Sequence, residues 1–274
     1  MGLLCFYNPT YTTDQPGVAV TGVTQEEARG SGVIIDSQGD ILTNRHIVAQ
    51  DPTLVTIPDD NGNPVPFTVT HELDHCEMGQ MPPDTKLPTE ADIKTLNPFV
   101  QIPFLAYTAQ PVYLSPTGDP LSGTESQAAD FAVLRITGLT TQASTFGVTS
   151  TPASFPFATL LPVKGYTMAG ETVITYGFPG DVTFGQGNAF ETLTMTGSVG
   201  HVTKILGGDR FYANTPLTID TDLEVSHGRS GSPLFWRGYV IGLITFFVGD
   251  NRTNSGSVAS DAMLVALRAN GFIR

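Results

Sequence analysis

The chain has 274 residues, with 29 glycines, 20 prolines and a charged fraction of only 14%. This composition suits many short strands joined by turns, and all-β double barrels commonly occupy this length as one unit. The net charge of −13 excludes an ordinary nucleic-acid-binding surface, because contact with phosphates requires a basic face. An acidic surface could instead attract basic peptides.

Residues 1–29 are polar and are predicted to form an N-terminal extension, with a possible strand at 18–23. The first residues lack the basic region and the long apolar stretch of a secretory signal, so a cytoplasmic location is favoured over a secreted one unless a leader has been removed. Cys5 and Cys76 are too few for a disulfide scaffold. A single bridge between them is possible, but the sequence does not indicate it.

The first regular elements are predicted from Gly30 onward. Residues 33–42 have the composition of strands, and His46 follows at their end. A hairpin is predicted next, with strands at 54–57 and 65–69 on either side of the turn signal at Asn61-Gly62.

Residues from about 71 to 127 are predicted to be an inserted loop more than a set of barrel strands. Prolines at 82, 83 and 88 and the Ser122-Gly123 pair interrupt any regular pattern there. Loops of this length are usually functional or disordered. We therefore expect a lid or a regulatory loop, on which a regulatory partner or an oligomer contact could act.

The same region contains His71-Glu72-Leu73-Asp74-His75, which matches a zinc-hydrolase motif. On a helix the two histidines would share one face, and Glu72 would act as the general base. The strand-like residues before it and the glycine and prolines after it argue against a helix. Three residues could supply a third ligand: Cys76, Glu77 and Glu90.

A strand is predicted at 130–136, and a second barrel is predicted at about 160–258. Its strands are expected at 172–176, 192–196, 199–204, 211–214, 233–236 and 240–247. A C-terminal helix at about 260–270 is predicted from the N-cap residue Ser260, from apolar residues at helical spacing and from the closing Asn270-Gly271.

The hexapeptide Gly228-Arg229-Ser230-Gly231-Ser232-Pro233 has the features of a nucleophile loop. A serine hydroxyl attacks a carbonyl only when a base removes its proton, and the resulting oxyanion needs N–H donors. Gly228 allows its N–H to turn toward the N–H of Ser230, and Gly231 lets the chain leave without crowding the hydroxyl. Glycine, serine and proline are also common in ordinary turns. A base and an orienting acid must therefore be found elsewhere, and His46 and Asp130 precede Ser230 in that order.

These segments resemble those of trypsin-like serine proteases of the chymotrypsin fold, and most of all the HtrA-like branch. That branch has Gly-Ser-Gly-Val-Ile-Ile-Asp, Thr-Asn-x-His-Val-Val, Asp-x-Ala-Leu-Leu and Gly-x-Ser-Gly-x-Pro segments. The chain has similar residues at 30–36, 43–48, 130–134 and 228–233, with further similarity at 175–180, 195–199 and 219–222. The resemblance covers roughly residues 30–262. Most HtrA-like proteins continue into a PDZ domain, which is not expected here.

The resemblance implies an all-β fold of two six-stranded antiparallel β-barrels with a C-terminal α-helix, the first barrel at about 30–140. It also implies a serine endopeptidase that acts through a His46–Asp130–Ser230 triad and an acyl-enzyme. Gly228 and Ser230 would supply the oxyanion-hole N–H groups. Trypsin is activated when a new N-terminal amine pairs with an aspartate before its nucleophile. Here Arg229 has that place, which indicates a protease that is active as synthesised or gated by loops.

Substrate specificity is less well determined. By resemblance, Glu224 lies near the floor of the primary pocket, where a carboxylate would favour lysine or arginine; HtrA-like pockets instead prefer small aliphatic residues, and Glu224 could equally point to solvent. Thr245, Phe246 and Phe247 lie on the expected substrate-pairing strand, although the aromatics could be ordinary core residues.

The expected partner is a protein or peptide substrate, with no nucleic acid, no membrane span and no cofactor. A zinc hydrolase that uses residues 71–75 and a catalytically silent binding module of protease fold are the alternatives.

Overall fold

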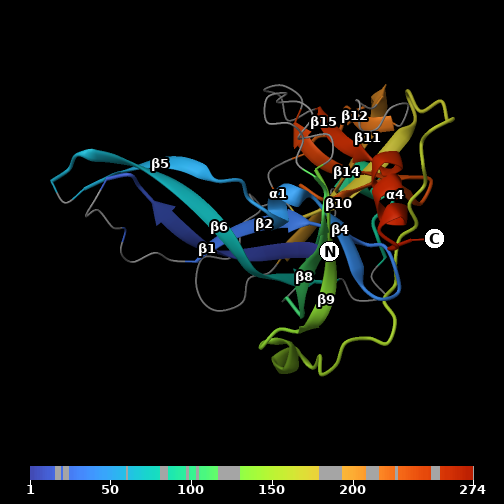
Figure 1. Cartoon of the computed structure of the whole chain (residues 1–274). Coiled ribbons are helices and arrows are strands. Elements are labelled where there is room, and N and C mark those ends of the chain that lie inside the picture. Colours follow the sequence, from blue (N-terminus) through green and yellow to red (C-terminus); the bar gives the residue numbers. More distant parts are fainter. Residues whose placement is uncertain are drawn as a thin grey trace.

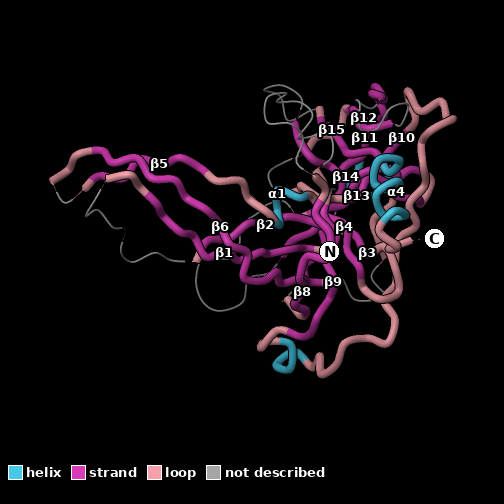
Figure 2. Tube along the Cα trace, in the orientation of Figure 1, coloured by secondary structure: helices cyan, strands magenta, loops and turns pink. Residues whose placement is uncertain are grey.

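A computed structural model shows two antiparallel β-sheets with few helices (Figures 1 and 2). The structure describes residues 1–15, 20, 25–59, 61–80, 86–96, 99–102, 105–116, 130–178, 193–207, 216–225, 228–247 and 254–273. The predicted strands at 18–23 and 211–214 fall wholly or almost wholly outside these residues. No helix in the described part is both long and apolar enough to cross a membrane.

The first sheet has eight strands in the order β2-β1-β6-β8-β9-β4-β3, with β5 paired to β6. Its edge strands β2 and β3 are consecutive in the chain and are separated by Gly32 alone, so the two edges of this partial barrel meet at that residue. The strands are β1 (Gly2–Thr12), β2 (Glu26–Ser31), β3 (Val33–Ile34), β4 (Asp40–Thr43), β5 (Thr53–Pro58), β6 (Pro64–Gly79), β8 (Tyr107–Leu114) and β9 (Ala132–Leu139). A single helical turn, α1 (Arg45–Val48), follows β4.

The second sheet closes on itself. Six strands follow the order β10-β13-β14-β15-β12-β11, and pairing of β10 with β11 completes the ring, while β7 is added outside β11. The strands are β7 (Phe99–Ile102), β10 (Thr172–Gly177), β11 (Leu193–Gly207), β12 (Pro216–Thr221), β13 (Pro233–Trp236), β14 (Tyr239–Phe247) and β15 (Ser255–Ala259). A short 3₁₀ helix (Ala143–Phe146) lies in the connection between the sheets. The predicted strands at 192–196 and 199–204 are parts of the single strand β11.

Helix α4 (Ser260–Ala269) ends the described fold and confirms the predicted C-terminal helix. It packs with both sheets: Met263 and Leu267 share one buried cluster with Leu42 of the first sheet and Val240 of the second. Asp261, in its first turn, accepts the backbone N–H groups of Val163 and Lys164 at 2.6 and 3.1 Å. The expected all-β, chymotrypsin-like arrangement with a C-terminal helix is thus confirmed, with one closed six-stranded barrel and one partial barrel.

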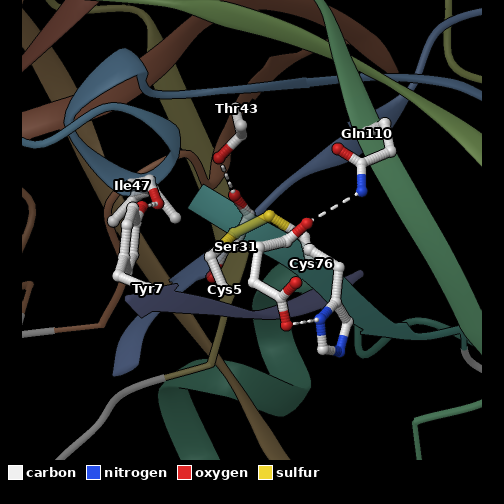
Figure 3. The surroundings of a disulfide bond; sticks show 9 residues. Cys5, Tyr7, Ser31, Thr43, Ile47, Cys76 and Gln110 are labelled. Carbon is white, nitrogen blue, oxygen red and sulfur yellow. Dashed lines mark hydrogen bonds and ion pairs between the residues drawn. A yellow bond between two sulfur atoms is a disulfide. The ribbon is translucent and has the colours of Figure 1, made fainter. Parts of the chain in front are cut away.

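The first sheet contains two features that the sequence did not predict. The N-terminal residues form β1, a full member of the sheet that pairs with β2 and, along its whole length, with β6. The outer parts of β1, β5 and β6 project from the rest of the fold as an arm (Figure 1). Cys5 and Cys76 face each other across β1 and β6, with Cα atoms 4.0 Å apart, and form a disulfide (Figure 3). Each cysteine has an ordinary strand environment in the sequence, so only the pairing of the two strands reveals the bond.

The prediction of a loop over about 71–127 is wrong for the residues that the structure describes. β6 continues to Gly79 and β8 pairs with β9, so both belong to the first sheet. Between them, helix α2 (Glu90–Leu96) and strand β7 cross to the second sheet, where β7 pairs with β11. Of the prolines that suggested a loop, Pro88 lies two residues before α2, and those at 82 and 83 lie outside the described residues.

Candidate active site

His46 and Asp130 form a doubly bonded pair at the junction of the two sheets. His46 lies on α1, directly after β4, and its Nδ1 is 2.5 Å from Asp130 Oδ2. The backbone N–H of His46 also donates to Asp130 Oδ1 at 2.9 Å. Asp130 precedes β9 and is only 8% exposed. The two bonds fix both the carboxylate and the imidazole, and they leave Nε2 as the free nitrogen of the ring.

Asn44 ties this pair to the second sheet. It occupies the N-cap position of α1, but its side chain makes no capping bond. The amide instead donates to the carbonyl oxygen of Asp130 at 2.8 Å and to Thr245 Oγ1 on β14 at 2.9 Å. Thr245 Oγ1 in turn donates to the carbonyl of Leu243 at 3.1 Å. A side chain that would ordinarily stabilise a helix end therefore connects the acid to the neighbouring barrel.

The predicted nucleophile loop lies against β2. The N–H of Ser31 donates to the carbonyl of Ser230 at 2.8 Å, and the Ser31 hydroxyl donates to the carbonyl of Gly228 at 3.2 Å. Gly231 has φ of 80°, and a Cβ added there would lie 2.1 Å from the Ser31 carbonyl oxygen and 2.5 Å from Thr43 Oγ1. Only glycine fits at this position, and Thr43 is three residues before His46. The loop is thus held next to the segment that carries His46.

Two backbone donors at the loop are free. Neither the N–H of Gly228 nor that of Ser230 donates to any other residue that the structure describes. Gly228 has φ of 85°, in the left-handed region that glycine reaches without strain. Within the described residues there is also no hydrogen bond between His46 and Ser230. Such bonds are often long in enzymes without substrate and shorten when substrate binds.

A buried tyrosine supports α1 from the first sheet. The Tyr7 hydroxyl donates to the carbonyl of Ile47, one residue after His46, and Tyr7 lies two residues from the disulfide on β1 (Figure 3). Burial raises the pKa of Tyr7, so the phenol stays a neutral donor at every physiological pH. A second bond near the disulfide joins β4 to β2: Thr43 Oγ1 donates to the Ser31 carbonyl at 2.7 Å.

The zinc alternative loses its geometric basis. Residues 71–75 lie in strand β6, where residues four apart are separated by about 13 Å and cannot share one ion. His71 instead contacts Glu26 at 3.0 Å, and His75 contacts Asp74 at 2.9 Å. Cys76 is in the disulfide, and the described residues contain no group of three or more possible metal ligands.

Comparison with known families decides the membership of the chain. The profile of the trypsin-like peptidase domain matches residues 30–243, which include His46, Asp130 and Ser230. The chain belongs to the trypsin-like peptidase family. The resemblance that its motifs predicted is therefore confirmed at the level of the family. A comparison with curated proteins finds no match.

Solved structures with similar folds include several proteases. One is an inactive form of Rv3671c from M. tuberculosis H37Rv, with 15% identity, coverage of 99% of this chain and 87% of that chain, and a TM-score of 0.46. Another is a variant of the HtrA-type protease AlgW with a decapeptide (15% identity, 98% and 64% coverage, TM-score 0.50). A third is Deg5 (15%, 96% and 87%, TM-score 0.46). The chain thus spans 64% of the AlgW chain, and the likeness at these identities concerns the fold.

The predicted specificity residues of this trypsin-like peptidase are only partly described. Glu224 is exposed between the buried residues Leu223 and Val225. Thr245 is buried at the bond to Asn44, so its side chain belongs to the support of the acid. Phe246 and Phe247 continue β14, but their side chains lie outside the described part of the structure.

The sequence interpretation did not assign roles to several residues that shape this site. Ser31 and Asn44 were noted only as parts of longer motifs, although their side chains bond to Gly228 and Asp130 respectively. Tyr7 lies in a segment that was predicted to be an extension. Asn44 and Ser31 could have been found in the sequence, because they lie in the same family motifs as His46 and Gly30. No local pattern identifies Tyr7.

Proposed function

We propose that the chain is a serine endopeptidase that hydrolyses peptide bonds through Ser230, His46 and Asp130. The observation that carries the proposal is the doubly bonded His46–Asp130 pair, held by Asn44 to β14. It lies close to a loop in which the N–H groups of Gly228 and Ser230 bond to no other described residue. A histidine fixed through Nδ1 by a buried carboxylate presents Nε2 as a base.

In the proposed reaction, His46 Nε2 takes the Ser230 Oγ proton as Oγ attacks the carbonyl carbon of the peptide bond. Asp130 stabilises the imidazolium that forms. The oxygen of the tetrahedral intermediate accepts from the N–H groups of Gly228 and Ser230. His46 then gives its proton to the departing amine as the C–N bond breaks, which leaves an ester on Ser230. Water repeats the cycle, releases the acid product and restores Ser230.

The proposed substrate is a protein or peptide. The substrate side chain next to the cleaved bond, which sets the specificity, has still to be assigned. Glu224 is exposed, and the chain is acidic overall, so a basic side chain next to the cleaved bond is the chemistry that fits these charges. Cleavage of a peptide library, read by mass spectrometry, tests this for the wild type and for Glu224→Gln. A preference for small aliphatic residues that ignores Glu224→Gln would remove Glu224 from the pocket.

The activity itself is tested with a fluorophosphonate probe, which reacts with activated serines. We expect the wild type to be labelled with or without a zinc chelator, and Ser230→Ala and His46→Ala to show no labelling. His201→Ala is the matched control, because His201 is also bonded to an aspartate, Asp222, and has no hydrogen bond to Ser230 within the described residues. A folded wild type that is not labelled would contradict the proposal and favour a silent binding module.

A further inference from the structure

Arg229 lies between the two residues whose N–H groups form the proposed oxyanion hole, and its side chain is buried. It is only 5% exposed. Its guanidinium donates to Ser198 Oγ at 2.8 Å and to Thr196 Oγ1, both on β11. Thr196 and Ser198 are two residues apart and so lie on the same face of the strand. Burying a guanidinium is costly unless its donors are bonded, so these hydroxyls define where the side chain can lie.

The position of Arg229 determines the direction of a catalytic donor. In a trans peptide the carbonyl of Arg229 and the N–H of Ser230 point in opposite directions. That carbonyl accepts the N–H of Ser232 at 2.9 Å, which leaves the N–H of Ser230 directed away from the turn. The side chain bonded to β11 and the carbonyl bonded to Ser232 together fix this peptide plane. The flanking glycines, which have positive φ, add no stiffness of their own.

The strand that holds Arg229, β11, is itself covered by α2 and β7, which lie in the chain between β6 and β8, two strands of the first sheet. In the β7–β11 register, Phe99 is opposite Thr196, one of the two residues that bind Arg229. Ile93 of α2 packs against Gly197, where an added Cβ would lie 2.7 Å from Ile93 Cδ1. Tyr176 donates to the carbonyl of Pro88 at 2.5 Å.

We propose that Arg229 is a positioning residue. Its bonds to Thr196 and Ser198, on the strand that α2 and β7 cover, hold the oxyanion-hole backbone in the conformation that binds the oxyanion. The inference rests on the proposed function. The region of α2 and β7 was expected to be part of a lid. In this proposal it stiffens β11, which lies behind the nucleophile loop. A change in the docking of this segment would then alter the rate of acylation without touching the substrate.

The test measures the reaction of the fluorophosphonate probe as a function of probe concentration, which separates the affinity KI from the maximal rate kinact. Arg229→Met removes the donors and keeps much of the side-chain length; Arg229→Lys keeps the charge without the two-pronged geometry. Arg135→Met is the matched control, because Arg135 is also bonded through two nitrogens, to Asp40 at 2.7 Å each, but in the first sheet. All variants are also followed to the end of labelling.

We expect Arg229→Met to lower kinact by about 10- to 100-fold with KI unchanged, which is less than the roughly 10²- to 10³-fold seen when an oxyanion-hole donor is removed outright, because the donor is misplaced and not lost. Arg229→Lys should recover part of that loss, and Arg135→Met should react like the wild type. The final labelled fraction should stay that of the wild type, because a misplaced donor slows the reaction whereas unfolding lowers the endpoint. A second variant, Thr196→Val with Ser198→Ala, retains the arginine and should lower kinact in the same way.

Two results would overturn the inference. One is a wild-type kinact for Arg229→Met, or for the Thr196→Val, Ser198→Ala variant. The other is a loss that appears only in the labelled endpoint, which would assign Arg229 to stability alone. In both cases the labelled wild type would still support the proposed function. An unlabelled wild type would overturn both proposals together.

Discussion

Two histidine–aspartate pairs in the described part of the chain have the same bonding pattern. In each, the histidine backbone N–H donates to one carboxylate oxygen and Nδ1 contacts the other: 2.9 and 2.5 Å for His46–Asp130, 2.5 and 3.2 Å for His201–Asp222. Their surroundings differ. The Asp130 side chain is 11% exposed and that of Asp222 is 46% exposed, while both histidines are about half exposed.

If the proposed function is right, the surroundings, and not the pair itself, decide whether such a histidine acts as a base. Asp130 is held by Asn44 and lies beside a loop with free N–H donors, whereas Asp222 faces solvent. A carboxylate in water interacts weakly with an imidazolium, because water screens the charges. The same two side chains can therefore be a catalytic element at one place and a surface contact at another.

The largest effect is expected from removing the charge of each acid in turn. Asp130→Asn should lower kinact of the fluorophosphonate reaction by about 10⁴-fold, because the neutral amide favours the wrong imidazole tautomer and cannot stabilise the cation. Asp222→Asn should leave kinact within about twofold of the wild type. Equal effects of the two substitutions would break the comparison.

The disulfide near Tyr7, which supports the helical turn of His46, is expected to have a large effect on stability. The disulfide closes a chain segment with a sequence separation of 71, and its loss should lower the free energy of unfolding by about 4 kcal/mol. The variant Cys5→Ala, Cys76→Ala, unfolded with urea beside the wild type, measures this. An unchanged midpoint would mean that the pairing of β1 with β6 is sufficient to hold the segment that bears Tyr7.

A smaller effect is expected from Asn44, which distinguishes the two pairs most directly. Asn44→Ala leaves the carbonyl of Asp130 and Thr245 Oγ1 without their donor, and we expect kinact to fall by about 10-fold, equivalent to about 1.4 kcal/mol. Thr245→Val removes the acceptor of one bond. In a double-mutant cycle the two losses should be less than additive. Full additivity would show that Asn44 does not act through β14.

Local patterns in the sequence were sufficient to predict some of the secondary structure and the candidate site residues. Strand-like composition predicted most of the barrel strands, and apolar residues at helical spacing predicted α4, because these depend on neighbours in the chain. The predicted N-cap at Ser260 is wrong: the N-cap is Ala259, and the Ser260 hydroxyl donates to the carbonyl of Leu161 at 2.5 Å. The candidate residues His46, Asp130 and Ser230 were found through short motifs, and the structure joins the first two. Their catalytic role remains a prediction.

The features that were missed depend on partners far away in sequence. The first 29 residues were predicted to be an extension because they are polar on the whole, and β1 is a strand through its pairing with β6. The crossing of β7 to the second sheet depends on its pairing with β11, which begins more than 90 residues later in the chain. The partners of Arg229 lie more than 30 residues before it, so the hexapeptide alone could not reveal them.

The bonds at the site also set an order of events during synthesis. Asn44 and Thr245 are separated by 201 residues, and Ser31 and Gly228 by 197. Contacts of such separation close late, since a chain that emerges from its N-terminus folds its earlier parts first. The first sheet can pair β1 with β6 once residue 79 is available, whereas the site needs β14. A nascent chain would thus remain without its assembled nucleophile loop until β14 has been made.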